Sequence, residues 1–178
     1  MKLLAFAASS SSQSINKQLV TFASSLVDNA TVEILDINDY EMPLFSEDRE
    51  KELGQPALAA AFFAKLGEAD AIMISFAEHN GSYTTAYKNL FDWTSRIDMK
   101  LFQNKPVVLL STSPGPGGAN TVLTAASASA PYFAADVKGA LSVPSFYKNF
   151  DVETQKLTNE SLLAELTTVV NTLSYSLA

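Results

Sequence analysis

Five short apolar runs divide the chain, and segments with helical spacing separate them. The runs are Lys2–Ala7, Thr31–Ile37, Ala71–Phe76, Pro106–Ser111 and Val137–Val143. Between them, apolar residues recur every three or four positions, as at Ile15, Leu19, Phe22 and Leu26, or at Ala86, Leu90, Trp93 and Ile97. Nearly continuous apolar strands that alternate with helices predict an α/β fold, a doubly wound parallel sheet with helices on both faces.

The remaining segments fit one domain over residues 1–178. Leu162, Leu166, Val169 and Leu173 lie on one face of a final helix, which Thr158 could cap. The charged segment Asn38–Gln55 contains Pro43, so we expect an irregular surface loop with at most a short helical turn rather than a linker.

Composition excludes several classes of function. The 178 residues contain no cysteine and one histidine, which excludes disulfides, thiolate nucleophiles and multi-histidine metal sites. The net charge of −7 argues against nucleic-acid binding, since that needs clustered cations. We expect no membrane association and a cytoplasmic protein, because no apolar run reaches roughly 20 residues and no signal-type N-terminus is visible.

Ligands of open parallel sheets bind beyond the carboxyl ends of the strands. After the first predicted strand, Ala8–Asn16 contains five serines, whose hydroxyl and N–H groups next to a helix N-terminus could hold an anion. The alternative is one capping serine within a flexible loop. Neither a GxxxxGK nor a GxGxxG pattern occurs, so triphosphatase and Rossmann dinucleotide functions are not supported.

Two further loops follow the third and fourth predicted strands. Asn80-Gly81 favours a turn with positive φ that could bring backbone against a planar ligand, and Ser82 could cap the next helix. The alternative is that Asn80-Gly81-Ser82 forms a turn with no role in binding a ligand. Ser111–Asn120 contains three glycines and two prolines, which suits an exposed, preshaped peptide surface or, alternatively, a tight strand-to-helix connection.

Together these loops resemble the NADPH-dependent FMN reductase family over roughly Lys2–Val143. Ser9, Ser14 and Asn16 match its first motif, Gly-Ser-x-Arg-x-x-Ser-x-Asn, whereas Ala8 and Ser11 replace the usual glycine and arginine. The second motif is Pro-Glu-Tyr-Asn-Gly-Ser followed by Lys-Asn and Asp-Trp, and the chain matches it at Glu78, Asn80, Gly81, Ser82, Lys88, Asn89, Asp92 and Trp93. The third motif is Ser-Pro-Gly with Gly-Gly, and the chain matches it at Ser113, Pro114, Gly115, Gly117 and Gly118.

The resemblance implies a flavodoxin-like sheet with strand order 2-1-3-4-5, FMN as cofactor, and NADPH or NADH as electron donor. No catalytic side chain and no metal ligand is expected. The implied cofactor-binding residues are Ser9, Ser11, Ser14, Ile15, Asn16, Ala77, Glu78, His79, Asn80, Gly81, Ser113, Pro114, Gly115, Gly117 and Gly118. Losing the arginine at Ser11 could weaken phosphate binding by about 1.5–3 kcal/mol.

Three other residues of these motifs have alternative roles. His79 replaces the family's tyrosine and lies near the flavin edge by resemblance, or is exposed or part of a subunit contact. Glu78 is expected to be structural or interfacial, because hydride transfer between nicotinamide and flavin needs no general base. Trp93 lies on an apolar stripe and is expected in the core or an interface.

The implied activity is hydride transfer from the nicotinamide to the flavin and then to a small acceptor, such as a flavin, quinone, azo compound or metal oxyanion. A homodimer or homotetramer is implied, and Tyr83, Tyr87 and Phe91 are expected to be exposed where a neighbour could cover them, or packed beneath Asn38–Gln55. The alternatives are a flavodoxin-type electron carrier, disfavoured because no glycine lies between Ser9 and Asn16, and a non-catalytic FMN- or anion-binding regulatory domain.

Overall fold

The computed structural model describes residues 1–175 and contains one five-stranded parallel sheet. Its strands are β1 (Lys2–Ala8), β2 (Thr31–Leu35), β3 (Ala71–Phe76), β6 (Pro106–Thr112) and β7 (Asp136–Val143). They lie in the order β2-β1-β3-β6-β7, with every neighbouring pair parallel. This order confirms the predicted 2-1-3-4-5 arrangement of a flavodoxin-like fold.

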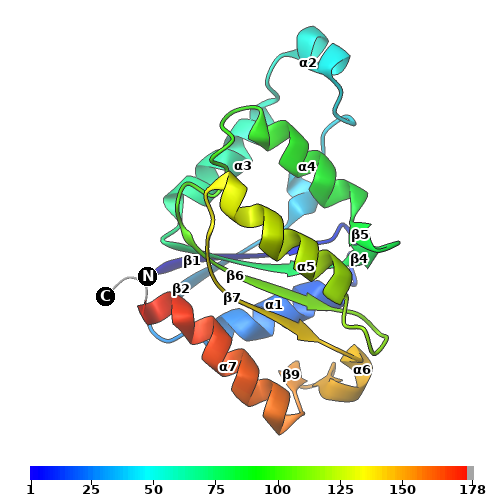
Figure 1. Ribbon diagram of the computed structural model, residues 1–178, viewed down its shortest axis with the longest axis vertical. Helices are drawn as coiled ribbons and strands as arrows, with labels where there is room; N and C mark the ends of the chain where they lie inside the picture. Colours follow the sequence, from blue (N-terminus) through cyan, green and yellow to red (C-terminus); the bar gives the residue numbers. More distant parts are fainter. Residues whose placement is uncertain (176–178) are drawn as a thin grey trace.

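Helices cover both faces of the sheet (Figure 1). α3 (Ala57–Glu68), α4 (Thr85–Ser95) and α5 (Asn120–Ser129) pack on one face, and α1 (Ile15–Ser25) and α7 (Glu160–Tyr175) pack on the other. Successive residues of β1 alternate between the two cores, Leu4 and Phe6 in one and Leu3 and Ala5 in the other. The central strands β1, β3 and β6 are therefore buried on both sides, which explains their continuous apolar runs, whereas the edge strands β2 and β7 are partly exposed.

Short elements complete the chain. β2 ends at Leu35, two residues before the predicted strand end at Ile37, because Asp36 caps the short 3-10 helix η1 (Ile37–Tyr40). The others are α2 (Glu47–Leu53), the hairpin β4 (Glu78–His79) and β5 (Ser82–Tyr83), η2 (Ala130–Phe133), α6 (Phe146–Asn149), and the hairpin β8 (Phe150–Asp151) and β9 (Lys156–Leu157). The last helix begins at Glu160, and Asn159 accepts a hydrogen bond from the Leu162 N–H, so the predicted Thr158 cap is wrong.

Segment 38–55 contains most of η1 and the seven-residue helix α2, which is more helix than the one short turn predicted. α4 holds the first part of this segment in place. Asn89 accepts a hydrogen bond from the Phe45 N–H and donates to the Met42 carbonyl, while the Trp93 indole donates to the Pro43 carbonyl at 2.7 Å. Trp93 is fully buried. The Asn and Trp of the second motif therefore act as a structural clamp on the segment after η1.

The exposure expected for Tyr83, Tyr87 and Phe91 is wrong in part. Tyr87 is only 4% exposed, and burial raises the pKa of its phenol. Tyr83 and Phe91 are half-buried in the same aromatic row, where Tyr83 contacts Phe76 and Phe91 contacts Phe133. These side chains belong to the core beneath α4 and α5, not to the region under segment 38–55.

Both the backbone conformation and the lack of space for a side chain require a glycine at position 118. Its φ is +57°, and a Cβ there would lie 2.2 Å from the Ser142 Oγ. We expect Gly118→Ala to destabilise the fold by about 1–3 kcal/mol through overpacking alone, because that hydroxyl is fixed by donating to the Gly118 carbonyl. Chemical denaturation measures the change.

Gly117→Ala is the matched control, since a Cβ at Gly117 meets nothing within 4 Å. Equal stability of the two variants would contradict this account of the loop.

Candidate functional site

The three loops singled out in the sequence lie at the carboxyl edge of the sheet and enclose a cavity of about 260 Å³. One wall comes from the loop after β1, another from the residues after β3, and a third from the residues after β6. The lining residues are Ser9, Ser11, Gln13, Ser14, Ile15, Asn16, Ala77, Glu78, His79, Thr112, Ser113, Pro114 and Tyr147. Ten of the fifteen residues proposed from sequence are among them.

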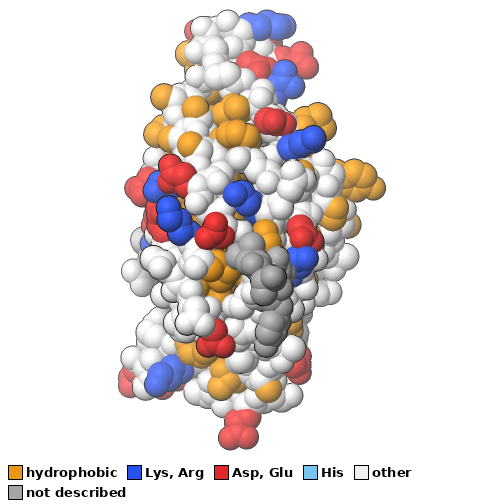
Figure 2. All heavy atoms as spheres, turned by 90° about the vertical axis from the view of Figure 1, so that its left-hand side faces the viewer, with side chains coloured by type: hydrophobic (Ala, Val, Ile, Leu, Met, Phe, Trp, Pro, Cys, Tyr) orange, Lys and Arg blue, Asp and Glu red, His pale blue; other side chains and the backbone are white. Residues whose placement is uncertain are grey.

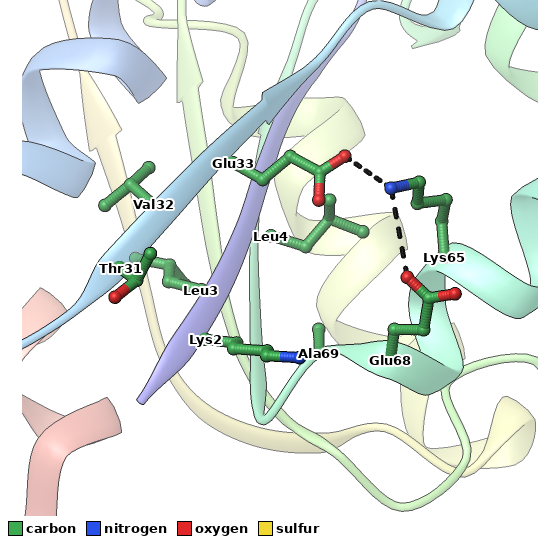
Figure 3. Close-up of a pocket in the computed structure, with 9 residues that line it drawn as sticks. All are labelled: Lys2, Leu3, Leu4, Thr31, Val32, Glu33, Lys65, Glu68 and Ala69. Carbon is green, nitrogen blue, oxygen red and sulfur yellow. Dashed lines mark ion pairs between the residues drawn. The ribbon is translucent and has the colours of Figure 1, made fainter.

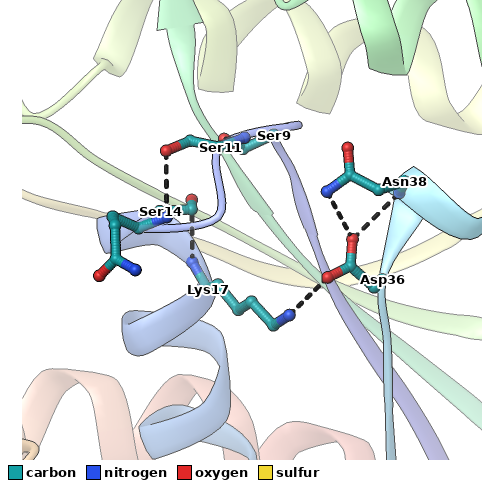
Figure 4. A network of polar contacts seen from close by, with 7 residues as sticks. Ser9, Ser11, Ser14, Lys17, Asp36 and Asn38 are labelled. Atoms are coloured by element: carbon teal, nitrogen blue, oxygen red, sulfur yellow. Dashed lines mark hydrogen bonds and ion pairs between the residues drawn. The ribbon is translucent and has the colours of Figure 1, made fainter.

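The serine loop after β1 is folded by its own hydroxyl groups. Ser9 Oγ accepts from the Ser11 N–H, Ser11 Oγ accepts from the Gln13 N–H, and Ser14 Oγ caps α1 by accepting from the Lys17 N–H (Figure 4). Ser14 is therefore the capping serine that the alternative expected, and the hydroxyls of Ser9 and Ser11 also bond within the loop.

The same loop keeps hydrogen-bond donors available for a ligand. Each of the three hydroxyls accepts a hydrogen bond from a backbone N–H and donates to no oxygen among the described residues. Because a hydroxyl can rotate, its hydrogen remains available to a ligand. Within residues 1–175, the N–H groups of Ile15 and Asn16, in the first turn of α1, also have no acceptor. Donors at a helix N-terminus that line a cavity suit an anion.

Asn16 fixes the position of this loop. Its Oδ1 accepts from the Ser75 hydroxyl at 2.7 Å and from the Thr112 N–H at 3.0 Å, and its Nδ2 donates to the Thr112 carbonyl. The side chain is 2% exposed. Asn16 thus ties the start of α1 to β3 and β6, while its backbone N–H remains for a ligand.

The loop after β3 forms the β4–β5 hairpin. Asn80 and Gly81 have φ values of 52° and 76°, which confirms the predicted positive-φ turn. The turn residues do not line the cavity; Ala77, Glu78 and His79 before them do. Ser82 lies in β5, and Thr84 caps α4 by accepting from the Tyr87 N–H, so the predicted Ser82 cap is wrong.

The glycine-rich loop after β6 is held from outside the cavity. The Phe146 N–H donates to the Ser113 carbonyl, the Ser145 N–H donates to the Gly115 carbonyl, and Ser111 and Ser142 hydroxyls donate to the Gly118 carbonyl. Ser113 and Pro114 line the cavity, whereas Gly115, Gly117 and Gly118 lie outside its lining. The glycines shape the loop, and its first residues face the cavity.

Sequence reasoning missed Gln13, Thr112 and Tyr147, which also line the cavity. Thr112 is the last residue of β6, one position beyond the predicted strand end. Tyr147 lies in α6 after β7 and is 65% exposed at the rim. The rule that ligands lie beyond strand ends applies to the fifth strand as well, and would have indicated Tyr147.

Among residues 1–175, no lysine or arginine lines the cavity. Lys17, in the first turn of α1, points away from the serines and pairs with Asp36 at 2.6 Å (Figure 4). This lysine, together with the Asn38 N–H, holds the pKa of Asp36 below its usual value. The lysine in the first turn of α1 is therefore paired outside the cavity.

A second hollow, of about 190 Å³, lies at the amino ends of β1 and β2 (Figure 3). Three of its charged groups pair with one another, since Lys65 lies 2.8 Å from Glu33 and 3.8 Å from Glu68. On the side of the molecule shown in Figure 2, acidic and basic side chains are interspersed without a patch of one sign. The free donors at the carboxyl edge make that cavity the better candidate.

The comparisons with known proteins decide the family. The family model for NADPH-dependent FMN reductase matches residues 1–148. The chain belongs to this family. The match confirms the resemblance in the three loop motifs.

Sequence relatives carry related names. An NADPH:quinone oxidoreductase of Arabidopsis thaliana is 36% identical over 87 residues, which are 49% of this chain and 43% of that protein. An NAD(P)H-dependent FMN reductase of Pseudomonas aeruginosa is 33% identical over 116 residues, 65% of this chain and 61% of that protein. The matched region thus spans about half the length of these relatives.

A solved structure shares the fold. The flavoenzyme NAD(P)H:(acceptor) oxidoreductase FerB of Paracoccus denitrificans has a TM-score of 0.75 at 20% identity, with 97% of this chain and 94% of that chain covered. The agreement extends through α7, beyond the region of the family match. In the described residues 1–175, no helix has the length and apolar character needed to cross a membrane.

We expect Asn16→Ala to destabilise the protein by more than about 2 kcal/mol. The change leaves the buried Ser75 hydroxyl and the Thr112 N–H and carbonyl without their partner. Urea unfolding of this variant beside Asn38→Ala, an exposed asparagine bonded to Asp36, measures it. Equal losses in both variants would mean that Asn16 does not hold the loop.

The Lys17–Asp36 pair predicts a pH dependence. Because the folded-state pKa of Asp36 is lowered, the pair stabilises the protein above the unfolded pKa, and this contribution is lost as the pH falls through the folded pKa. Both side chains are more than a third exposed, so we expect the pair to contribute less than about 1 kcal/mol to the free energy of unfolding.

Thermal unfolding of Asp36→Asn and the parent protein gives the test. The parent should be the more stable near neutral pH, and the difference should be lost as the pH falls through the lowered pKa of Asp36. A difference that grows on acidification would have the wrong sign for this pair.

Proposed function

We propose that this protein is an FMN-dependent NAD(P)H oxidoreductase that passes hydride from a nicotinamide to the flavin and then to a small acceptor. The observation that carries the proposal is the serine loop, which offers free donors at a helix N-terminus on the wall of the carboxyl-edge cavity. Family membership over residues 1–148 supports the choice of FMN as the anionic ligand.

The donor set suits a flavin phosphate. Ser9, Ser11 and Ser14 can each donate a hydroxyl hydrogen, and Ile15 and Asn16 offer backbone N–H groups at the positive end of α1. An anion held by neutral donors is compatible with a net charge of −7. We assign the phosphate to this loop.

The other two walls suit the planar part of the cofactor. Ala77 and His79 before the turn, and Ser113 and Pro114 after β6, present backbone and small or flat side chains to the cavity. Both loops are fixed from behind, by Thr84 to the Ala8 carbonyl and by Ser145 to the Gly115 carbonyl. Preorganised peptide groups can orient a ring without rearranging, which lowers the cost of binding.

FMN supplies the hydride chemistry when bound. The chain's residues bind and orient it, and none is needed as a general acid, base or nucleophile. His79 is exposed and lines the cavity, so it contributes an edge contact rather than proton transfer in this proposal. The names of the relatives, quinone oxidoreductase and FMN reductase, support quinones and flavins as acceptors ahead of azo compounds and metal oxyanions.

The remaining parts of the proposal follow the family resemblance. The chain would act as one flavodoxin-like, FMN-binding domain over residues 1–178, in a cytoplasmic homodimer or homotetramer, with NADPH or NADH as donor. Because Tyr87 is buried within one chain, the aromatic row beneath α4 gives no support to a particular subunit interface.

FMN titration into apoprotein, followed by flavin fluorescence and the visible spectrum, tests the proposal, with NADPH or NADH then added anaerobically. We expect saturable binding and bleaching of the oxidised flavin, and regain of colour when a quinone is added. Binding without bleaching would support an electron carrier, and no binding at high micromolar FMN would support a regulatory or altered-ligand domain.

Ser11→Arg should tighten FMN binding. A guanidinium at this lining position adds a charge-assisted hydrogen bond of about 1.5–3 kcal/mol, which is about 10- to 100-fold in Kd. Riboflavin, which lacks the phosphate, should bind the variant and the parent alike.

Ser12→Arg is the control, since Ser12 is exposed and does not line the cavity. If Ser11→Arg gained affinity for riboflavin as much as for FMN, the phosphate would not lie in the serine loop.

A further inference from the structure

Glu78 makes a contact that joins two walls of the cavity. It lies in β4, directly after the β3 strand end, and its Oε2 accepts a hydrogen bond of 2.9 Å from the Val122 N–H. Val122 is the third residue of α5, the helix that follows the glycine-rich loop. A side chain of one loop therefore caps the helix that anchors another.

α5 has no cap of its own. The Asn120 N–H donates to the Gly117 carbonyl. The residue before the helix, Ala119, has φ 60° and no side chain able to accept a hydrogen bond, so the Val122 N–H lacks a local partner. The Glu78 carboxylate supplies that partner and lies at the positive end of the α5 dipole. Glu78, the only acidic side chain among the described residues that line the cavity, is thereby held at a site that favours negative charge.

The hairpin has two further attachments. Tyr83, which pairs with Glu78 across the hairpin, contacts the Ser129 hydroxyl at the other end of α5 at 3.2 Å. Thr84 donates to the Ala8 carbonyl at the end of β1. Of these attachments, the Glu78 contact is the one nearest the loop Ser113–Ala119.

We propose that Glu78 is a positioning residue that fixes the spacing between the cavity wall after β3 and the cavity wall after β6. The inference rests on the proposed function, since a flat ligand held between these walls needs them at a set distance. The relevant property is the hydrogen bond to Val122, with no part taken by Glu78 in proton transfer.

Two substitutions separate the hydrogen bond from the charge. In Glu78→Gln, the amide oxygen can still accept from the Val122 N–H, but the charge is removed. In Glu78→Ala, the acceptor is lost and the two walls are uncoupled. We expect FMN to bind Glu78→Gln within about threefold of the parent protein, and Glu78→Ala at least about tenfold more weakly.

Asn171→Ala is the matched control. Asn171 of α7 accepts from the Asp28 N–H and donates to the Leu26 carbonyl at the end of α1 opposite the serine loop, and none of these residues lines the cavity, so its loss lowers stability without altering the cavity. We expect the Asn171→Ala melting temperature to fall while its FMN affinity stays that of the parent. A purely structural Glu78 would give the same pattern as this control.

Amide hydrogen exchange of the apoproteins gives a readout that does not depend on FMN. In Glu78→Ala, we expect faster exchange both in the first turn of α5 and in the hairpin residues Glu78–Tyr83, with Glu78→Gln restoring protection at both. If the parent protein bound no FMN, the proposed function would fail, and the exchange data would still decide the role of Glu78.

Three results would overturn the inference. One is an affinity for FMN in Glu78→Ala equal to that of the parent. Another is an exchange change confined to α5 with the hairpin unaffected, which would make Glu78 a local helix cap. Equal weakening of Glu78→Gln and Glu78→Ala would assign the effect to charge and would also contradict the proposal.

Discussion

The side chain of Asn16 holds together the edge of the sheet on which the rest of the site depends. Three hydrogen bonds connect this buried amide to Ser75 on β3 and to Thr112 at the end of β6. Because an amide can donate and accept at once, one side chain satisfies a hydroxyl, an N–H and a carbonyl that would otherwise be buried without partners. The first turn of α1 is thereby fixed relative to two of the central strands.

This arrangement frees the serine hydroxyls and the α1 N–H groups for a ligand. It also explains how an acidic chain can offer an anion site without a cation on the cavity wall, since Lys17 is engaged by Asp36. A site built from neutral donors holds a phosphate less tightly than one with an arginine. Affinity for a flavin must then come largely from the walls around its ring system, whose spacing depends on Glu78 and on the anchored loop after β6.

Much of the fold could be predicted from sequence because the strand signal is strong. The run Ala71–Phe76 is buried on both faces, so its apolar residues are continuous and its bounds coincide with β3. The second strand was predicted too long because Ile37 is buried in a 3-10 turn, and apolar periodicity does not distinguish the two. Cap positions were harder, since Ser82 and Thr84 are equally good caps and the hairpin geometry chooses between them.

The candidate site could be predicted in outline through its motifs, whereas the roles of single residues depended on tertiary contacts. Asn16 and Asn89 match the family pattern, but sequence could not reveal that their side chains bond to distant backbone. Glu78 could be assigned a structural role, yet its partner lies 44 positions away at Val122. Tyr147 was missed because it follows a strand whose loop carries no recognisable motif.

An amide NMR titration with FMN and riboflavin in parallel tests the central claim most directly. The account predicts that both ligands shift the amide signals of Ala77–Gly81 and Ser113–Gly118, and that FMN alone shifts those of Ile15 and Asn16. Identical shifts with both ligands at the start of α1, or shifts confined to the hollow around Lys65, would contradict the assignment of the serine loop as the phosphate site.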